Sequence, residues 1–391
     1  MPSLFTTAVH SGHLAPKPGE PSAPPIVTAS GWSYEDMTAL DAALGDAAAG
    51  YVYSRNAAPT QEAFEAALNA LEGGAGAAAF ASGMAALHAA LLAAAGENCT
   101  GFVAATELYG ATQGLVKHMA AQTGRPLAWV NIRDQAAVAA ALAPGRVLLF
   151  EVISNPLCHV ADAGALLALA RAAGARSVVD STFTTPLLVR PLALGADFVA
   201  HSATKYIGGH GDVLAGVVAA ATEADALALR RVRQMLGANL SPFDAYLCLR
   251  GLRTMPLRVR EQNANALGLA QWLAQQPRVA QVYYPGLPDN ADHALAARLL
   301  PAGMYGAMLS FDLRDAGRAQ VFAFMEKLRV IQRVPTLGDV ATLAAYPAHA
   351  SHRSLTAEQR AALGIGDGCV RISAGIEALD DLLADLEQAL A

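Results

Sequence analysis

A lysine and an acid stand at the ends of two apolar runs in the middle of the chain. Ser177–Asp180 reads SVVD and closes on the carboxylate, whereas Ala196–Ala200 reads ADFVA and leads into HSATKYIGGHGD, which contains Lys205. Short β-branched runs with helical stretches between them indicate βα units and a largely parallel sheet. Ligands of such sheets bind beyond the carboxyl ends of the strands. We therefore expect Asp180 and Lys205 at one sheet edge.

These residue types suit pyridoxal phosphate. A lysine amine can hold the cofactor's aldehyde as a Schiff base, and a carboxylate can keep the pyridine nitrogen protonated, so that the ring accepts electrons. Ser202 and Thr204 flank the lysine and can donate hydroxyl groups to a phosphate. On spacing alone, a surface lysine and a helix-capping acid explain the same pattern, since both are common at strand ends.

The lysine segment resembles the corresponding motif of the Cys/Met-metabolism family of pyridoxal-phosphate enzymes. VDSTFTTP around Asp180 and ELYGAT at Glu107–Thr112 resemble two further family motifs, and the likeness runs nearly end to end. The family contains cystathionine γ-synthase, the cystathionine lyases, methionine γ-lyase and the O-acylhomoserine sulfhydrylases. It implies an α/β protein of fold type I, with a mostly parallel sheet in a large domain and a smaller α+β C-terminal domain.

With 391 residues the chain is long enough for two packed domains. We expect an N-terminal arm over 1–55, a large cofactor-binding α/β domain over 56–245 and a C-terminal α+β domain over 246–391. The proline-rich start indicates an extended arm, which must pack on something, another subunit being one option. The resemblance implies a homotetramer in which two subunits share each active site.

The resemblance also assigns roles to single residues. Lys205, Tyr109 and Asp180 would be catalytic, with Tyr109 stacked on the ring and assisting proton transfer. SGM at 82–84 precedes an apolar helix, whose free N–H groups suit an anion. YSR at 53–55 would reach the phosphate of the adjacent subunit, although without the family a surface ion pair is the favoured interpretation of that arginine. The cofactor-binding residues implied are Tyr53, Arg55, Ser82, Gly83, Met84, Tyr109, Asn155, Asp180, Ser202, Thr204 and Lys205.

The substrate contacts follow from the C-terminal motifs. VRISAGIE resembles the family segment whose arginine forks onto the substrate α-carboxylate, which assigns that role to Arg371. Thr336 replaces a serine that helps to hold the carboxylate, and Asn155 completes the set. Pro335 stands where cystathionine enzymes have a glutamate that reads the distal amino group. The loss of this glutamate makes cystathionine a less favoured substrate.

Other departures bear on the family subgroup. Ala111 replaces a cysteine of methionine γ-lyases, and Arg233 and Gln234 replace their lysine and aspartate. Ala58 replaces an asparagine of the phosphate-binding turn. The main hypothesis is still γ-elimination by a C–S lyase acting on a methionine- or homocysteine-like amino acid, giving a 2-keto acid, ammonia and a thiol. The alternatives are γ-replacement on an O-acylhomoserine with sulfide or a thiol, then cystathionine γ- or β-elimination, and a non-catalytic vitamin-binding regulator.

The overall composition of the chain indicates which partners, locations and metal sites to expect. A net charge of −6 argues against a nucleic-acid partner. Alanine supplies much of the 54% hydrophobic content, and neither a membrane span nor a secretion signal is evident. Four dispersed cysteines predict no disulfide, and no cluster has metal-ligand spacing. We expect a soluble, cytoplasmic enzyme with a small-molecule amino-acid substrate and no metal.

Overall fold

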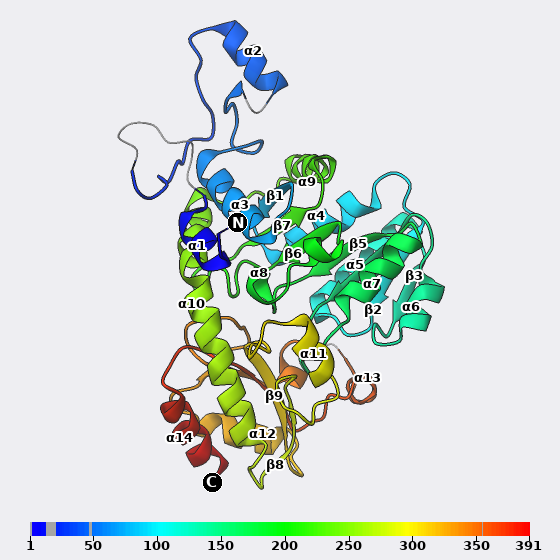
Figure 1. Cartoon of the computed structure of the whole chain (residues 1–391), viewed down its shortest axis with the longest axis vertical. Coiled ribbons are helices and arrows are strands. Elements are labelled where there is room, and N and C mark those ends of the chain that lie inside the picture. Colours follow the sequence, from blue (N-terminus) through cyan, green and yellow to red (C-terminus); the bar gives the residue numbers. More distant parts are fainter. Residues whose placement is uncertain (1, 13–20, 47–48, 354) are drawn as a thin grey trace.

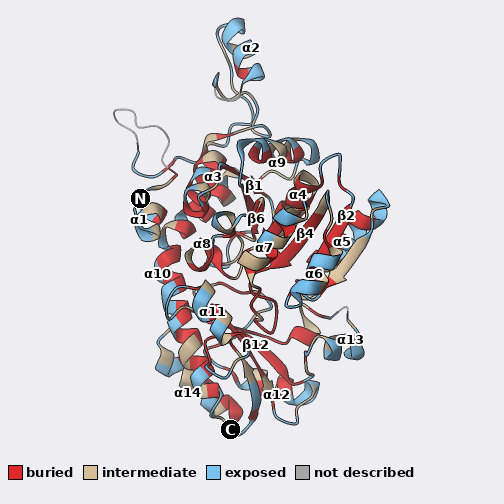
Figure 2. Ribbon diagram, turned by 45° about the vertical axis from the view of Figure 1, so that its right-hand side comes forward, coloured by how far each residue is buried: buried red, intermediate tan, exposed pale blue. Residues whose placement is uncertain are grey.

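Two β-sheets organise the chain, one in each half of the sequence (Figure 1). The protein is represented by a computed structural model that describes residues 2–12, 21–46, 49–353 and 355–391. Figure 2 shows that the buried residues follow the strands and the helix faces turned toward them. Within the described part of the chain, no helix is both long and apolar enough to span a membrane.

The larger sheet is mostly parallel, as the sequence predicts. Its strands are β1 (Gly76–Phe80), β2 (Gly101–Ala105), β3 (Leu127–Val130), β4 (Arg146–Glu151), β5 (Arg176–Asp180), β6 (Phe198–His201) and β7 (Gly216–Ala220). They lie in the order β1-β7-β6-β5-β4-β2-β3, and β7 alone of these runs antiparallel to its neighbours. Since β4, β5 and β6 are adjacent and parallel, their carboxyl ends meet at one edge.

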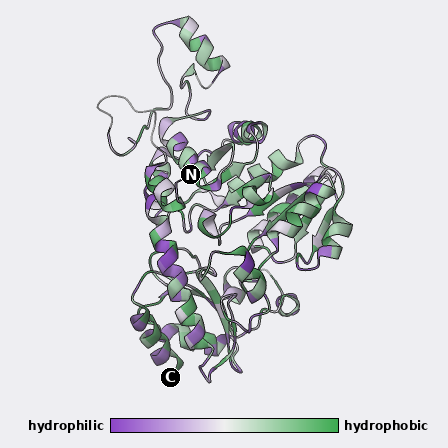
Figure 3. Cartoon of the chain, in the orientation of Figure 1, coloured by the Kyte–Doolittle hydropathy of each residue, from purple (hydrophilic) through white to green (hydrophobic). Residues whose placement is uncertain are grey.

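Helices pack around this sheet. They are α3 (Pro59–Glu72), α4 (Gly83–Ala95), α5 (Gly110–Thr123), α6 (Gln135–Ala141), α7 (Ala163–Ala172), α8 (Thr185–Leu188) and α9 (Glu223–Leu236). Figure 3 shows most of this region as hydrophobic. The alanine-rich α4 crosses β5, β6 and β7, because its small side chains allow a close approach to the sheet. This crossing brings the start of α4 to the strand edge.

The second sheet lies in the C-terminal half. Its strands are β8 (Val279–Tyr283), β9 (Met308–Leu313), β10 (Gln332–Arg333), β11 (Leu343–Ala345) and β12 (Cys369–Ser373), in the order β10-β11-β12-β9-β8. The helices of this half are α10 (Pro242–Leu273), α11 (His293–Leu299), α12 (Arg318–Lys327), α13 (Ala357–Ala362) and α14 (Leu379–Leu390). β9 begins at Met308, shortly after Gly306 turns the chain with a φ of 99°.

The arm departs from the sequence prediction. Its first part is not extended but forms α1 (Leu4–His10), which packs on α3 and α10 of its own chain. After the undescribed residues 13–20, α2 (Met37–Gly45) stands away from the body of the molecule (Figure 1). Its Met37 and Leu44 are exposed. The arm therefore combines a docked first helix with a projecting second one.

The long helix starts earlier than its motif suggests. The sequence pattern begins at Leu249, whereas α10 begins at Pro242, where proline suits the first helical turn. The Ser241 hydroxyl accepts the Asp244 N–H at 3.1 Å and caps the helix. The expected domain boundary at 245/246 thus falls inside the first turns of α10, and the division into domains stays a prediction.

Candidate active site

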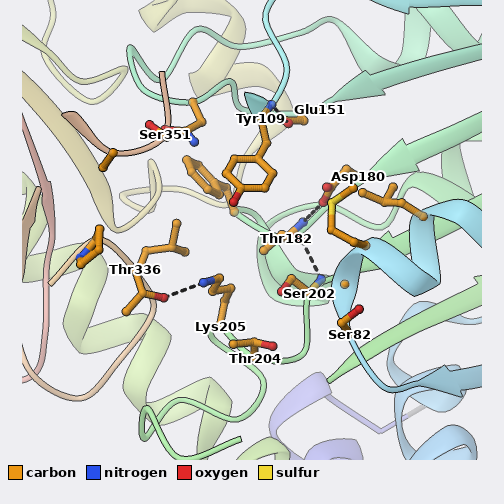
Figure 4. Close-up of a pocket in the computed structure, with 18 of the residues that line it drawn as sticks. Ser82, Tyr109, Glu151, Asp180, Thr182, Ser202, Thr204, Lys205, Thr336 and Ser351 are labelled. Carbon is orange, nitrogen blue, oxygen red and sulfur yellow. Dashed lines mark hydrogen bonds between the residues drawn. The ribbon is translucent and has the colours of Figure 1, made fainter. Parts of the chain in front are cut away.

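A cavity of about 430 Å³ lies at the carboxyl ends of β4, β5 and β6 (Figure 4). Its other walls come from the start of α4, the segment 335–337 and β12. Every residue that the sequence assigned to the site lines it, apart from Tyr53 and Arg55. Those that it brings together are Ser82, Gly83, Met84, Tyr109, Asn155, Asp180, Ser202, Thr204, Lys205, Thr336 and Arg371. The volume is in the range typical of small-molecule sites.

Lys205 lies in the turn that follows β6. Its Nζ donates to the Thr336 hydroxyl at 2.5 Å, so the amine points into the cavity (Figure 4). Burial, together with the positive charge of Arg371, lowers the pKa of Lys205 to about 8. A sizeable fraction of the amine is therefore neutral, and nucleophilic, near neutral pH.

The turn around Lys205 is more tightly packed than its glycines suggest. Gly208, Gly209 and Gly211 follow the lysine closely, a composition typical of a flexible loop. Instead, Gly208 and Gly209 are buried, and the Gly209 N–H donates to the Lys205 carbonyl at 2.7 Å. A Cβ on Gly208 would lie 2.5 Å from Val213. The glycines here permit close packing around the lysine.

Asp180 ends β5 beside the lysine turn. Its Oδ1 accepts the Thr182 N–H at 2.9 Å, and the Thr182 hydroxyl accepts the Ser202 N–H at 2.9 Å. Burial raises the pKa of Asp180, while the hydrogen bonds to Thr182 and the charge of His201 act in the opposite direction. These contacts fix the carboxylate at the strand edge, where a cationic ring nitrogen would lower its pKa further.

The start of α4 offers an anion cradle. Ser82 caps the helix by accepting the Ala85 N–H at 3.1 Å, which leaves the first-turn N–H groups of Gly83 and Met84 without intrahelical acceptors. A Cβ on Gly83 would lie 2.8 Å from both Cβ and Oγ of Ser202. The bare glycine backbone therefore keeps the space beside the Ser202 hydroxyl open.

Thr204 lies in the cavity wall, but its hydroxyl group is hydrogen-bonded to the backbone of Ala215. Its hydroxyl donates to the Ala215 carbonyl at 3.1 Å and accepts the Ala215 N–H at 2.9 Å. These bonds tie the lysine turn to the segment that precedes β7. Of the two hydroxyl residues that flank Lys205, Ser202 is therefore the better placed to donate to a phosphate.

Arg371, on β12, lines the cavity from the C-terminal part of the chain. It is buried, and its guanidinium donates to the Asn155 Oδ1 and to the Thr336 carbonyl, both at 3.0 Å. Its buried Nε–H has no hydrogen-bond partner in the described part of the chain. Burial lowers the pKa of Arg371. A carboxylate would satisfy both the orphaned donor and the buried charge.

Tyr109 also lines the cavity. It follows β2 at the start of α5, and its phenol ring extends into the cavity (Figure 4). The Tyr109 N–H donates to the Glu151 Oε1 at 2.6 Å. With 43% of its surface exposed, the ring has room to stack on a planar ligand.

Tyr53 and Arg55 lie outside this chain's own cavity. The Tyr53 side chain is 46% exposed, and the Arg55 guanidinium lies 5.4 Å from the centre of its ring. The Arg55 Nη1 donates to the Gln234 carbonyl at 2.8 Å, next to the end of α9. Within one copy of the chain, these residues therefore do not reach the cavity.

Arg233 also lies outside the cavity, and its contacts stabilise the fold. It is buried and forms an ion pair with Glu65. Its Nη2 donates to the Asn56 carbonyl at 3.1 Å and so fastens the turn that carries Arg55. Ala58 follows in that turn and leaves α3 without a side-chain N-cap, as expected from the missing asparagine.

Several wall residues were not predicted from the sequence. The sequence alone assigns no role to Glu151, Thr182 or Ser351, which all line the cavity. Ser351 comes from the C-terminal half, and its carbonyl approaches so closely that a Cβ on Gly110 would lie 2.6 Å away. Only the folded pairing of the two halves brings such residues together.

The residues of the cavity fit pyridoxal phosphate. A lysine of lowered pKa, an acid at the neighbouring strand end, an open helix start and an exposed phenol match its aldehyde, ring nitrogen, phosphate and ring face. The fold and site thus define a fold-type-I pyridoxal-phosphate enzyme. A model of the family described as Cys/Met metabolism PLP-dependent enzyme matches residues 5–391, and the chain belongs to that family.

Individual relatives cover nearly the full length. L-methionine gamma-lyase of Pseudomonas putida is 40% identical, over 100% of this chain and 98% of the relative. O-succinylhomoserine sulfhydrylase of Pseudomonas aeruginosa is also 40% identical, over 99% of this chain and 94% of the relative. A crystal structure of cystathionine gamma synthase from Xanthomonas oryzae pv. oryzae in complex with cystathionine has a TM-score of 0.92 at 38% identity and covers 100% and 98% of the two chains.

Replacing Gly83 with alanine is expected to weaken cofactor binding by about tenfold or more. The added Cβ would collide with Ser202, and overpacking of this kind costs about 1–3 kcal/mol. Titration of the cofactor-free protein with pyridoxal phosphate measures the change. Gly114→Ala is the matched control, because no atom lies within 4 Å of its added Cβ. Unchanged affinity in Gly83→Ala would contradict the cradle.

The lowered pKa of Lys205 predicts a pH profile for cofactor capture. The neutral amine is the reactive form, so the rate should rise as the pH increases through about 8. Stopped-flow absorbance of the cofactor-free protein mixed with pyridoxal phosphate records this rate. A profile that rises only near pH ~10.4, the value for an ordinary lysine, would show that the site leaves the pKa of Lys205 unchanged.

Proposed function

We propose that the enzyme catalyses γ-elimination on a methionine- or homocysteine-like amino acid. A thioether substrate and water give a thiol, ammonia and a four-carbon 2-keto acid, whereas a homocysteine-like substrate releases hydrogen sulfide in place of the thiol. The proposal rests on which charged and apolar residues line the cavity. Among the described lining residues, Glu151 and Asp180 supply the carboxyl groups, and both lie at the strand edge. The segment beyond the lysine contributes Pro335 and Leu337, which suit an apolar γ-substituent better than a second ammonium group.

The roles proposed for the residues follow from their positions. Bound pyridoxal phosphate supplies an electron sink for the charge left when a Cα proton is removed. Arg371 and Asn155 hold the substrate carboxylate. The Lys205 amine takes the Cα proton and returns protons during the reaction. Tyr109 assists proton transfer at the γ-substituent, and Asp180 holds the proton on the ring nitrogen.

The closest rival is γ-replacement on an O-acylhomoserine. The relative named O-succinylhomoserine sulfhydrylase, 40% identical to this chain, gives this alternative its weight. The two reactions share the early proton transfers and differ in whether water or a thiol completes the cycle. Elimination from cystathionine ranks next, with cysteine and a four-carbon keto acid as its γ-products and homocysteine and pyruvate as its β-products.

Product analysis separates these reactions. Purified holoenzyme would receive methionine, homocysteine, cystathionine or O-acetylhomoserine, each with and without added thiol. The proposal predicts a four-carbon keto acid and ammonia from methionine or homocysteine alone. Turnover that requires both O-acetylhomoserine and a thiol would favour the sulfhydrylase, and pyruvate from cystathionine would favour β-elimination.

The proposal includes a homotetramer with active sites shared between two subunits. Its support is the surface position of Tyr53 and Arg55, which reach no phosphate site within their own chain. The exposed Met37 and Leu44 of the projecting α2 offer apolar surface for a second copy (Figure 3). A cytoplasmic location also remains a prediction, in keeping with four free, buried cysteines.

Mixing two inactive variants tests the shared site. Arg55→Ala would damage the phosphate contact that a subunit supplies to its neighbour, whereas Lys205→Ala would damage the subunit's own site. After the two are unfolded and refolded together, hybrid assemblies should contain some intact sites and regain a fraction of the activity. Each variant refolded alone is the control. Absence of recovery in mixtures whose hybrid assemblies have been isolated would contradict sharing.

A further inference from the structure

Glu151 connects two segments of the active site. It is the last residue of β4, it is 5% exposed, and it lines the cavity. Its Oε1 accepts the Tyr109 N–H at 2.6 Å, and its carboxyl group also accepts the backbone N–H of Asn155. Tyr109 follows β2, whereas Asn155 follows β4. One side chain thus holds the backbone of both.

The two held residues carry side chains that face the ligand. Tyr109 is the N-cap of α5, where its carbonyl accepts the N–H groups of Thr112 and Gln113, and Glu151 holds its N–H. Asn155 accepts from the Arg371 guanidinium at 3.0 Å. A shift of the Glu151 carboxyl group would therefore move the phenol and loosen the carboxylate fork together.

The protonation state of Glu151 follows from its neighbour. Glu151 pairs directly with Asp180 in the register of β4 and β5, and neighbouring strands are about 4.8 Å apart. Two neighbouring carboxyl groups in a buried site do not both ionise readily. Burial, and then the charge of Asp180, raise the pKa of Glu151 well above its usual value. The hydrogen bond from Thr182 and the charge of His201 both stabilise the ionised form of Asp180. Of the two carboxyl groups, Glu151 is therefore the one that stays protonated.

We propose that Glu151 is a positioning residue, a neutral carboxyl group that fixes Tyr109 and Asn155 through their backbone N–H groups. It takes no part in proton transfer. The proposal deepens the proposed function, since it rests on the roles given there to Tyr109 and Asn155. It adds that catalysis requires the position of the Glu151 carboxyl group and not its negative charge.

Glu107 provides a matched control. Its Oε2 accepts from the Ser154 hydroxyl at 2.9 Å and lies 2.7 Å from the His159 Nδ1, so it ties the same two segments together. It does not line the cavity, and 21% of its side chain is exposed. In Glu107→Gln the hydrogen bonds of Glu151 are kept while another tie between the same two segments is weakened. The variant therefore shows how far catalysis depends on the rigidity of these segments alone.

The experiment compares Glu151→Gln with Glu151→Asp in the holoenzyme. Glutamine keeps the length and a neutral oxygen acceptor, whereas aspartate keeps the acid but withdraws it by one methylene. We expect kcat of Glu151→Gln within about threefold of the parent, and kcat of Glu151→Asp lower by about 100-fold, as for a displacement of about 1 Å. A role that depends on charge or proton transfer predicts the opposite order.

Two readouts besides turnover keep the test independent of folding and of the leaving group. Cofactor affinity, measured by titration, should change by less than about threefold in both Glu151 variants and in Glu107→Gln. Exchange of the substrate's Cα hydrogen in D2O should follow the order glutamine above aspartate, whichever product forms. A wrong proposed function would change the product and leave this order intact.

A double-mutant cycle with Tyr109→Phe tests whether Glu151 acts through Tyr109. If it does, Glu151→Asp costs much less in the Tyr109→Phe background than in the parent, because the phenol hydroxyl is already lost. Full additivity of the two effects would overturn the proposal. So would a glutamine variant as impaired as the aspartate variant.

Discussion

Replacing Lys205 with alanine is expected to abolish the lysine-linked visible absorbance of the bound cofactor and to lower turnover by about 10⁴-fold or more. The variant lacks both the nucleophile for the aldehyde and the group proposed to move protons, and general acid–base catalysis alone contributes up to about 10⁴-fold. Its Nζ also donates to Thr336 at 2.5 Å, a bond that is lost with the side chain. Absorbance spectra and keto-acid formation measure the two losses.

Lys327→Ala is the control for this change, because Lys327 is exposed at the end of α12, in the other half of the chain. It should leave both the spectrum and the turnover unchanged. If Lys205→Ala retained substantial turnover, a catalytic role for Lys205 would be wrong. A vitamin-binding regulator would instead keep its interactions without this amine.

Replacing Arg371 with leucine is expected to lower kcat/KM by about 10³-fold. The substrate carboxylate would lose its guanidinium partner, and the loss of one member of a buried charged pair costs about 2–5 kcal/mol. Arg371→Lys should fall between the parent and the leucine variant, since lysine keeps the charge and lacks the fork. Steady-state kinetics on the best amino-acid substrate give these ratios.

The leucine variant carries a second signature that involves no turnover. The positive charge of Arg371 contributes to the lowered pKa of Lys205, so its removal should raise that pKa above about 8. The pH profile of cofactor capture should then move to higher pH. A profile that did not move, together with a normal kcat/KM, would place the substrate carboxylate elsewhere.

The reactive core of the site could be predicted from the sequence because the constraints on it are local. Asp180 and Lys205 follow two apolar runs, and parallel strands bring their carboxyl ends to one edge. The α4 start could be predicted for the same reason, since Ser82 caps the helix from three residues away. Family motifs then supplied Arg371 and Thr336, which lie far from Lys205 in the sequence.

Other features depend on pairings that a single sequence does not reveal. The role of Glu151 required the register that sets it opposite Asp180. The burial of Arg233 required α9 to pack on α4 and β1, where Glu65 neutralises its charge. Only the start of the arm was wrongly expected to be extended, because α1 folds against the distant α10.

The most direct test of γ-elimination is the isotope content of the keto acid formed in D2O from the amino acid that turns over best. During γ-elimination the Cγ–S bond breaks and Cγ then receives a proton from the active site, which exchanges with solvent. The account predicts a four-carbon keto acid whose terminal methyl group carries solvent deuterium. Pyruvate, or an amino-acid product in which Cγ has joined to a thiol, would contradict it.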